Sequence, residues 1–148
     1  MPNGPVILRC KSCRTLNRVP SDRLLSHPTC GQCKKPLEFP RAPVTATAAT
    51  FEQEIFDWPE YVLLEFWAKW CGYCRMVEPV VNDLASWRAG RLKVARVDID
   101  AEPGLAKRFT VKATPTFIVF KNGTQVARMD GAPKEKLDLV QWLDQIMK

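Results

Sequence analysis

Long hydrophobic runs are missing from this sequence of 148 residues. The longest apolar stretches, such as residues 117–120, are far shorter than the roughly 20 residues that a membrane-spanning helix needs. Residues 1–8 contain neither a basic segment nor a long apolar one, so we expect no secretory signal. Internal repeats and low-complexity segments are also missing. These absences favour a globular protein that does not associate with membranes, and we expect it in the cytoplasm.

Acidic side chains are scarce in the N-terminal third of the chain. Residues 1–43 contain eight basic and two acidic side chains, whereas residues 44–148 contain fourteen of each, so the net charge of +6 lies in the first segment. This asymmetry indicates two units with different roles. A basic unit suits nucleic acid or an acidic protein surface. Because Phe39 is the only aromatic residue there that could stack on a base, we expect a solvated surface or a protein partner and no nucleic acid.

Apolar residues are too few and too scattered within residues 1–40 to form a self-sufficient core. A unit of this size needs a staple, either a metal ion or a disulfide. The sequence Pro-Arg-Ala-Pro at 40–43 then favours an extended linker. We therefore predict a small module over residues 1–40, a linker and the start of the first strand over 41–47, and a larger domain over 48–148.

The larger domain alternates between strand and helix patterns, which predicts an α/β fold with a mixed sheet and helices on both faces. The Asn-Gly pair at 122–123 predicts a hairpin, which adds an antiparallel edge to the sheet. Thr50 and Gln53 have the spacing of a capping box, and Pro133 is expected to open the last helix. The predicted strands cover residues 61–67, 92–99, 116–120 and 124–129, and the predicted helices include 76–87 and 103–109.

Six cysteines form three Cys-x-x-Cys pairs, which in an intracellular chain indicate metal binding or redox catalysis. Cys71 and Cys74 lie between a predicted buried strand and an amphipathic helix, which puts Cys71 at the N-terminus of that helix. Unpaired backbone N–H groups and the helix dipole favour a thiolate there. Cys74 lies one turn further on, where it is placed to attack a mixed disulfide formed by Cys71.

The residues around this pair suit exchange with a polypeptide substrate. Gly72 leaves room for a substrate backbone, and Trp70 offers an apolar contact beside the sulfur. The alternatives for the pair are a structural disulfide or half of a zinc site. No further ligand lies nearby in the sequence, because the only histidine, His27, is far upstream. We therefore interpret Cys71 and Cys74 as a redox centre.

Glu65 interrupts the apolar run of the strand predicted over residues 61–67. A carboxylate buried without a partner is costly, so we expect a raised pKa for Glu65. If its side chain faces the cysteines, it could accept or donate a proton as Cys74 attacks. The alternative is a charge on a half-exposed strand face, paired with a lysine or an arginine. We assign Glu65 a catalytic role, with this alternative left open.

Thr114 and Pro115 directly precede another buried strand. A proline that follows a polar residue at such a position is a candidate for a cis peptide bond, although cis bonds are uncommon even before proline. The alternative is an ordinary proline that initiates a strand.

Two further Cys-x-x-Cys pairs are separated by sixteen residues, and their members are Cys10, Cys13, Cys30 and Cys33. This spacing matches a tetrahedral zinc site with four cysteine ligands, and zinc would supply the staple that the small module needs. Gly31 suits the tight turn from which the second pair would bind the metal. The alternatives are a second redox centre or one disulfide within each pair. We expect one structural Zn²⁺ ion.

Residues 44–148 resemble the thioredoxin family along their whole length. The matching segments are 65–76 (EFWAKWCGYCRM), Pro79, 97–100 (VDID), 113–116 (ATPT), 120–123 (FKNG) and Gly131. The resemblance implies a thioredoxin fold, with Cys71 as nucleophile, Cys74 as resolving thiol and a cis Pro115 that helps to bind substrate backbone. We accordingly expect substrate contacts at Trp70, Gly72, Tyr73, Thr114, Pro115 and Gly131.

Three residues depart from the usual thioredoxin pattern. The family usually has proline where this chain has Tyr73, and the residues between the cysteines tune the reduction potential, so we expect a more oxidising pair. The buried acid of the family is usually aspartate, whereas this chain has Glu65. The family often has lysine where this chain has Arg96, which cannot lose its proton and acts only as a fixed charge near Glu65.

The two-part layout resembles the zinc-finger-bearing bacterial thioredoxins of the thioredoxin-2 type. This resemblance implies a cytoplasmic thiol–disulfide oxidoreductase that reduces disulfides in protein substrates. It also implies reduction of the protein by an NADPH-dependent thioredoxin reductase. We expect a monomer without an organic cofactor, and we leave open whether the zinc module is structural, recruits partners or senses oxidation.

Overall fold

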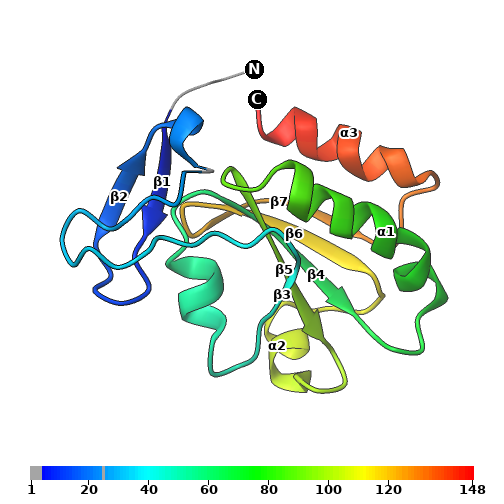
Figure 1. Cartoon of the computed structure of the whole chain (residues 1–148). Coiled ribbons are helices and arrows are strands. Elements are labelled where there is room, and N and C mark those ends of the chain that lie inside the picture. The colour runs from blue at the N-terminus through cyan, green and yellow to red at the C-terminus, as the bar shows by residue number, and fades with distance from the viewer. Residues whose placement is uncertain (1–4, 25) are drawn as a thin grey trace.

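Two β-sheets organise the chain in the computed structural model, which describes residues 5–24 and 26–148. Figure 1 shows a small N-terminal sheet beside a five-stranded sheet that has helices on both faces. The predicted mixed α/β architecture is therefore confirmed. The module predicted over residues 1–40 includes residues 1–4 and Leu25, which lie outside the described residues. Within the described chain, every helix is too short or too polar to cross a membrane.

The strands of the larger sheet are arranged in the order β3-β5-β4-β6-β7. β3 and β4 each pair with β5 in parallel, and β6 pairs antiparallel with β4 and β7. Asn122 and Gly123 join β6 to β7 with positive φ angles of 51° and 79°, as the predicted hairpin turn requires. The strands are Val44–Thr45 (β3), Tyr61–Trp67 (β4), Leu92–Asp98 (β5), Thr116–Lys121 (β6) and Thr124–Asp130 (β7).

Successive side chains of the central strands point to opposite faces of the sheet, and each face has its own helices. Leu63 and Phe117 belong to an apolar cluster with residues of α1 and α3 on one face. Leu64 and Ile118 belong to a second cluster, on the face covered by α2 and a π-helical segment. The helices are Gly72–Trp87 (α1), Pro103–Arg108 (α2) and Lys136–Ile146 (α3), with the π-helical segment at Glu52–Phe56 and a 3-10 turn at Ser21–Arg23.

Two helix starts differ from the predictions. α3 begins after Glu135 rather than at Pro133, because Glu135 is the N-cap residue and forms a reciprocal capping box with Asp138. Thr50 does not cap the π-helical segment, and its hydroxyl instead accepts a hydrogen bond from the Thr47 N–H at 2.9 Å. In both places, polar side chains of the loop bind backbone groups that the spacing of residues alone does not reveal.

The N-terminal sheet is an antiparallel pair of β1 (Val6–Arg9) and β2 (Leu16–Val19). It shares its core with the larger domain, because Leu8 and Leu37 belong to the same apolar cluster as Ile55. The shortage of apolar residues in this module is therefore compensated by side chains from the larger domain.

Polar contacts attach the module to the residues that precede β4. Glu60 Oε2 accepts a hydrogen bond from the Ile7 N–H at 3.0 Å, and Arg14 forms an ion pair with Asp57 at 2.6 Å. Because Cys71 follows the opposite end of β4, the module and the start of α1 lie at opposite sides of the molecule (Figure 1).

Candidate active site and metal centre

Cys71 is the N-cap residue of α1 and has an extended backbone conformation, with φ −83° and ψ 111°. Its sulfur accepts a hydrogen bond from the Cys74 N–H at 3.1 Å, which satisfies one of the free N–H groups of the first turn. Both cysteines are free thiols, and Cys71 is only 4% exposed. The junction of β4 and α1 thus holds the pair at a helix start, as the sequence predicts.

The two thiols differ in acidity. Burial would raise the pKa of Cys71, but hydrogen bonds with the Cys74 and Thr114 side chains and with the backbone N–H groups of Cys74 and Tyr73 bring its pKa below the usual value. Burial and the neighbouring Cys71 sulfur raise the pKa of Cys74 to about 12. The helix start therefore holds one thiol that ionises readily and, one turn further on, one that keeps its proton. Such a pair can supply a nucleophile followed by a resolving thiol.

Glu65 lies in the middle of β4, and its side chain is fully buried. Its Oε1 atom accepts a hydrogen bond from Arg96 Nε at 3.0 Å, whereas Oε2 has no partner among the described residues. Burial raises the pKa of Glu65 to about 7, although the Arg96 guanidinium acts in the opposite direction. The carboxylate is therefore deeply buried with a raised pKa, as the catalytic hypothesis requires, and it is also paired with an arginine, as the alternative hypothesis states. Its charge contributes to the raised pKa of Cys74, so the two groups lie within electrostatic reach.

The segment before β6 faces the dithiol. The Thr114–Pro115 peptide bond is cis, as the resemblance implies, and the Cys71 thiol donates a hydrogen bond to the Thr114 carbonyl at 3.3 Å. The Pro115 carbonyl accepts a hydrogen bond from the Gly131 N–H at 2.8 Å. Gly131 has a φ of 86°, a conformation that favours glycine. These contacts bring Thr114, Pro115 and Gly131 together beside the nucleophile.

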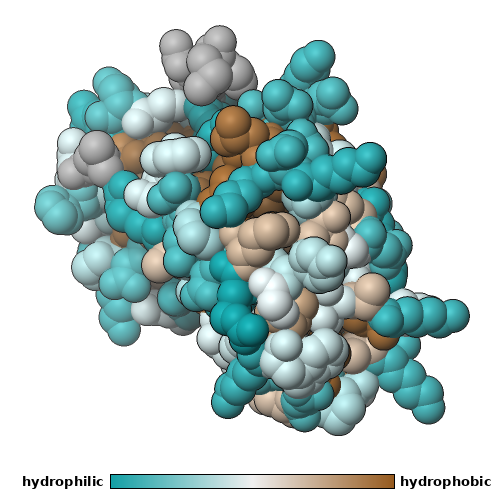
Figure 2. Space-filling model, turned by 90° about the vertical axis from the view of Figure 1, so that its right-hand side faces the viewer, coloured by the Kyte–Doolittle hydropathy of each residue, from teal (hydrophilic) through white to brown (hydrophobic). Residues whose placement is uncertain are grey.

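The rim of the dithiol is apolar and exposed. Trp70 and Tyr73 are each 65% exposed, and the indole Nε1 of Trp70 donates to Asp100 Oδ2 at 2.9 Å. A Cβ atom at Gly72 would meet no atom within 4 Å, so the backbone there is open to an approaching chain. Figure 2 views the side of the molecule on which α1 and α3 begin; its surface is mostly hydrophilic, and the most hydrophobic side chains lie in the upper part of the view.

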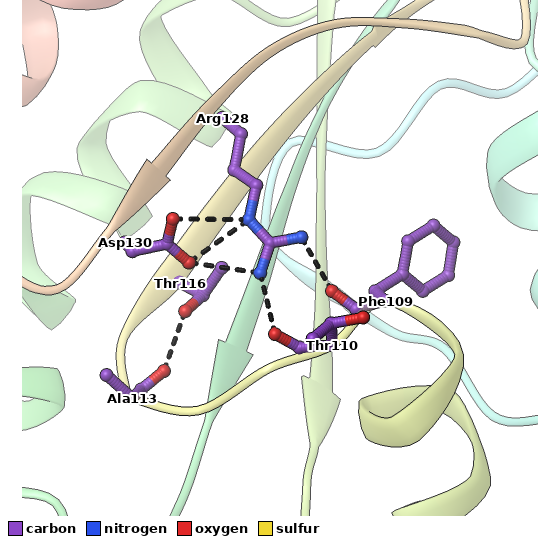
Figure 3. A network of polar contacts seen from close by, with 6 residues as sticks. All are labelled: Phe109, Thr110, Ala113, Thr116, Arg128 and Asp130. Atoms are coloured by element: carbon purple, nitrogen blue, oxygen red, sulfur yellow. Dashed lines mark hydrogen bonds and ion pairs between the residues drawn. The ribbon is translucent and has the colours of Figure 1, made fainter.

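One polar residue near this site was missed by the sequence analysis. The guanidinium of Arg128, on β7, donates to the Phe109 and Thr110 carbonyls at 2.6 and 3.0 Å and pairs with Asp130 (Figure 3). Arg128 and Asp130 occupy alternate strand positions, which is a local signal of a same-face ion pair. The two carbonyls come from a distant segment, and no local pattern identifies them.

The four N-terminal sulfurs converge on one point. The Sγ atoms of Cys10, Cys13, Cys30 and Cys33 all lie within 4.8 Å of one another. The Cys10–Cys33 and Cys13–Cys30 sulfur distances are 3.6 and 3.5 Å. Zn–S bonds of ~2.3 Å in a tetrahedron place sulfurs roughly 3.8 Å apart, whereas a disulfide requires about 2 Å. The residues therefore fit a tetrahedral metal ion.

Both N-terminal Cys-x-x-Cys turns have the same backbone geometry. The Cys10 N–H donates to the Thr15 carbonyl, and the Cys10 carbonyl accepts from the Arg14 N–H, both at 2.9 Å. The turn at Cys30 repeats these two hydrogen bonds at 2.8 and 2.9 Å. The residue after the second cysteine has a positive φ in both turns, 69° at Arg14 and 67° at Lys34. The two pairs therefore present their sulfurs from equivalent turns.

Asn17 supports one of these turns, and the sequence analysis did not identify it. Its Nδ2 atom donates to Cys30 Sγ at 3.5 Å, and its Oδ1 atom accepts from the Gly31 N–H at 2.9 Å. Hydrogen bonds from the Cys33 backbone N–H and from Asn17 lower the pKa of Cys30 to about 6. A thiolate is the form that binds zinc, so these contacts suit a metal ligand.

Known proteins match both parts of the chain. Residues 42–145 match the family model described as Thioredoxin, and residues 9–35 match a zinc-ribbon model described as Thioredoxin 2, N-terminal. Thioredoxin C-3 of Corynebacterium nephridii is 38% identical over 140 residues, which cover 95% of this chain and 94% of that protein. The bifunctional thioredoxin reductase/thioredoxin of Mycobacterium leprae is 38% identical over 104 residues, which cover 70% of this chain and 22% of that protein.

A solved structure shares the larger domain. A mutant thioredoxin from Halobacterium salinarum NRC-1 has a TM-score of 0.66 and 29% sequence identity, and the match covers 75% of this chain and 96% of that one. The family model spans the sheet, the dithiol at the start of α1 and the cis-proline segment. The chain therefore belongs to the thioredoxin family of thiol–disulfide oxidoreductases, with Cys71 and Cys74 as its active-site pair.

Proposed function

We propose that this protein reduces disulfide bonds in other proteins, with Cys71 as nucleophile and Cys74 as resolving thiol. The observation that carries this proposal is the position of Cys71 at the N-cap of α1, where its sulfur accepts a hydrogen bond from the Cys74 N–H and contacts the Thr114 carbonyl before the cis proline. The lowered pKa of Cys71 and the raised pKa of Cys74 agree with these roles. The Cys71 thiolate attacks a substrate disulfide, which forms a mixed disulfide and releases one substrate thiolate. Cys74 then attacks the Cys71 sulfur, releasing the second substrate thiolate and leaving an oxidised pair. Two electrons pass from the protein to the substrate.

Glu65 is the proposed proton acceptor for Cys74. A thiol with a pKa of about 12 is almost entirely protonated at neutral pH, so its attack requires a base. The pKa of Glu65 is about 7, which matches this task near neutral pH. The absence of a hydrogen-bond partner for Oε2 within the described chain supports the role, since that atom is available as an acceptor.

Polypeptide substrates are proposed to bind around Cys71. The exposed aromatic rings of Trp70 and Tyr73 supply apolar contacts, and Gly72 leaves space for a backbone. The Thr114 carbonyl contacts the nucleophile, and a backbone hydrogen bond joins Gly131 to Pro115 in the same segment. The residue set for substrate contact is therefore Trp70, Gly72, Tyr73, Thr114, Pro115 and Gly131.

An NADPH-dependent thioredoxin reductase is the proposed electron donor. The fusion of a reductase with a thioredoxin in the Mycobacterium leprae relative supports this partner. We further propose that the protein acts as a monomer in the cytoplasm. A reducing compartment is consistent with a site that needs thiolate ligands.

Insulin reduction tests the proposed reaction. The reduced protein is expected to cleave insulin disulfides, and Cys74→Ser is expected to accumulate a mixed disulfide with insulin that dithiothreitol releases. The mixed disulfide forms because serine cannot attack the Cys71 sulfur. Turnover of insulin by Cys71→Ser at the wild-type rate would refute the assignment.

A structural zinc ion is the second part of the proposal. The four sulfurs fit a tetrahedral ion, and the ion would join two turns that otherwise depend on a core shared with the larger domain. The position of the cluster, at the opposite end of β4 from Cys71, favours a structural role over direct contact with the substrate disulfide. Metal analysis of the purified protein is expected to give one zinc per chain.

Partner recruitment by the module is a second candidate role, favoured by the excess of basic side chains in residues 1–43. Oxidation sensing would require that the four thiolates lose zinc when oxidised. Zinc release at the peroxide dose that inactivates the protein would support sensing, and zinc retention at that dose would exclude it.

A further inference from the structure

Arg128 lies outside the residues proposed above, yet its guanidinium binds the segment 109–115, which links α2 to β6. Nη1 donates to the Phe109 carbonyl at 2.6 Å, and Nη2 donates to the Thr110 carbonyl at 3.0 Å. Figure 3 shows the guanidinium between these carbonyls and the Asp130 carboxylate, which accepts from Nε at 3.1 Å. All three nitrogens of the planar group are engaged, an arrangement that a lysine ammonium cannot reproduce.

The two carbonyls lie at the C-terminal end of α2, where backbone C=O groups lack intrahelical partners and the helix dipole is negative. Phe109 is the C-cap residue of that helix. Thr110 follows with a φ of 53°, which is uncommon for a β-branched residue. The guanidinium satisfies these carbonyls and holds Thr110 in its left-handed conformation. It therefore fixes the direction in which the chain leaves α2.

The other end of the segment is held independently. The buried Thr116 hydroxyl donates to the Ala113 carbonyl at 2.6 Å (Figure 3). Between these two attachments, the Thr114 carbonyl accepts a hydrogen bond from the Cys71 thiol at 3.3 Å. Arg128 at one end and Thr116 at the other thus determine where the Thr114 backbone lies relative to the nucleophile.

We propose that Arg128 is a positioning residue for substrate binding, because it holds segment 109–115 so that Thr114 and Pro115 present their backbone to a polypeptide beside Cys71. This role rests on the proposed function, in which substrates bind at Thr114 and Pro115. Arg128 acts through the segment, since its guanidinium contacts the far end of the segment and not the reacting sulfurs. Reduction of a polypeptide disulfide therefore depends on Arg128, whereas reduction of a small disulfide does not.

The test compares Arg128→Met and Arg128→Lys with Arg88→Met in the full-length, zinc-loaded protein. Arg88 is a matched control, because the side chains of Arg88 and Arg128 are both 25% exposed and each pairs with an aspartate. The partner of Arg88 is Asp144 on α3, away from the dithiol. Three quantities are measured: steady-state reduction of insulin, reaction with the small aryl disulfide dithiobis-nitrobenzoate, and hydrogen exchange of segment 109–115.

Arg128→Met is expected to raise the KM for insulin about fivefold to tenfold, with kcat and the reaction with the aryl disulfide changed less than about twofold, because only polypeptide binding needs the positioned segment. Arg128→Lys is expected to show nearly the same increase in the KM for insulin as Arg128→Met, since the ammonium keeps the charge but not the planar fork. Hydrogen exchange in segment 109–115 should rise in both Arg128 variants and stay at the wild-type level in Arg88→Met.

An unchanged KM for insulin in Arg128→Met would overturn the proposal, and so would an equal loss of reactivity towards insulin and the aryl disulfide. If Arg128→Met does not fold, Arg128→Lys provides the same kinetic and exchange comparison. Failure of the proposed function itself would be recognised by a separate result, obtained with the wild-type protein. If the wild-type protein reacts with the aryl disulfide but does not reduce insulin, protein-disulfide reduction fails as the function, whatever Arg128 does.

Discussion

The protein contains the Cys-x-x-Cys spacing in two different backbone settings. At Cys10 and Cys30, each pair closes a tight turn that is followed by a left-handed residue, and all four sulfurs converge within 4.8 Å. At Cys71, the pair begins a helix, and Cys74 lies one turn inside it. Spacing alone therefore supplies two nearby sulfurs. The backbone conformation decides whether they point towards a shared metal ion or remain available for exchange.

The surroundings of the two settings differ as well. The Cys71 sulfur contacts the carbonyl before a cis proline, and a buried carboxylate at Glu65 lies within electrostatic reach of Cys74. The Cys30 sulfur instead accepts hydrogen bonds from Asn17 and from a backbone N–H, which favour a thiolate that stays in place. An exchange site needs an acceptor for protons, whereas a metal site needs stable thiolates.

Replacing one cysteine of each setting with serine should have the largest effect on insulin turnover or zinc content. Cys71→Ser is expected to reduce insulin turnover to background and to keep zinc, because it removes only the nucleophilic thiolate. Cys13→Ser is expected to lose zinc and to keep the dithiol reaction in the folded fraction, because it removes one of four metal ligands. Insulin turnover and zinc content per chain measure both effects. Zinc loss in Cys71→Ser would contradict the separation of the two sites.

Removal of zinc should give the next largest effect. A structural zinc site contributes folding free energy, and the module shares its core with Ile55 of the larger domain. Chelation is therefore expected to lower the melting temperature of the whole chain by on the order of 10 °C. Calorimetry with and without a chelator measures this shift, and insulin reduction at 25 °C serves as the control for an intact dithiol. An unchanged melting temperature would argue against a structural role.

Glu65 should make stability fall as the pH rises. Its pKa is about 7 in the folded protein against a usual value of 4.5, so the folded state binds the proton more tightly than the unfolded state. The stabilisation is complete below about pH 4.5 and is lost as the pH rises through about 7, which amounts to roughly 3 kcal/mol.

Glu65→Gln stays neutral and is expected to lack this dependence, as urea unfolding at about pH 5 and about pH 8 would show. Part of the stabilisation is already lost at about pH 5, which lies above the usual pKa of 4.5, so the difference in unfolding free energy between Glu65→Gln and the wild type should change by roughly 2.5 kcal/mol between the two pH values. Parallel pH profiles for the two proteins would rule out Glu65 as the titrating group.

Asp57→Asn should give the smallest effect. The ion pair of Arg14 and Asp57 joins the module to the larger domain, but the two side chains are 38% and 49% exposed. Solvent screening limits such a pair, so the free energy of unfolding is expected to fall by less than about 1 kcal/mol. Urea unfolding measures the change, and zinc content should stay at one ion per chain. Loss of zinc in this variant would mean that the ion pair, rather than the shared core, holds the module.

Much of the fold follows from patterns that are local in the chain. The apolar run at residues 61–67 and the Asn122-Gly123 turn predict a buried strand and a hairpin, and both are present. The predicted helix starts are wrong where a loop side chain can form a hydrogen bond with any of several backbone groups. The start of α3 depends on a capping box at Glu135, and the hydroxyl of Thr50 binds Thr47 instead of capping a helix.

The candidate sites divide in the same way. The four N-terminal cysteines and the pair at Cys71 are visible in the sequence, because their spacing is short and their residue type is rare. The partner of Cys30 is not visible there, since Asn17 reaches Cys30 from β2, and the placement of Arg96 near Glu65 came only from the resemblance to the thioredoxin family. A contact between strands depends on register and burial, and neither is a property of a short sequence window.

The sequence by itself determined which sulfurs could act together, since a Cys-x-x-Cys spacing brings two thiols within reach in almost any turn or helix start. It also determined the mixed sheet, through apolar periodicity and one hairpin turn. Tertiary structure alone decided the environment that tunes those sulfurs. It set burial and hydrogen bonds at Cys71 and Cys74, so their pKa values move in opposite directions. It also placed the Arg128 guanidinium on carbonyls of a distant segment, because sheet pairing and helix packing bring together residues that the chain separates.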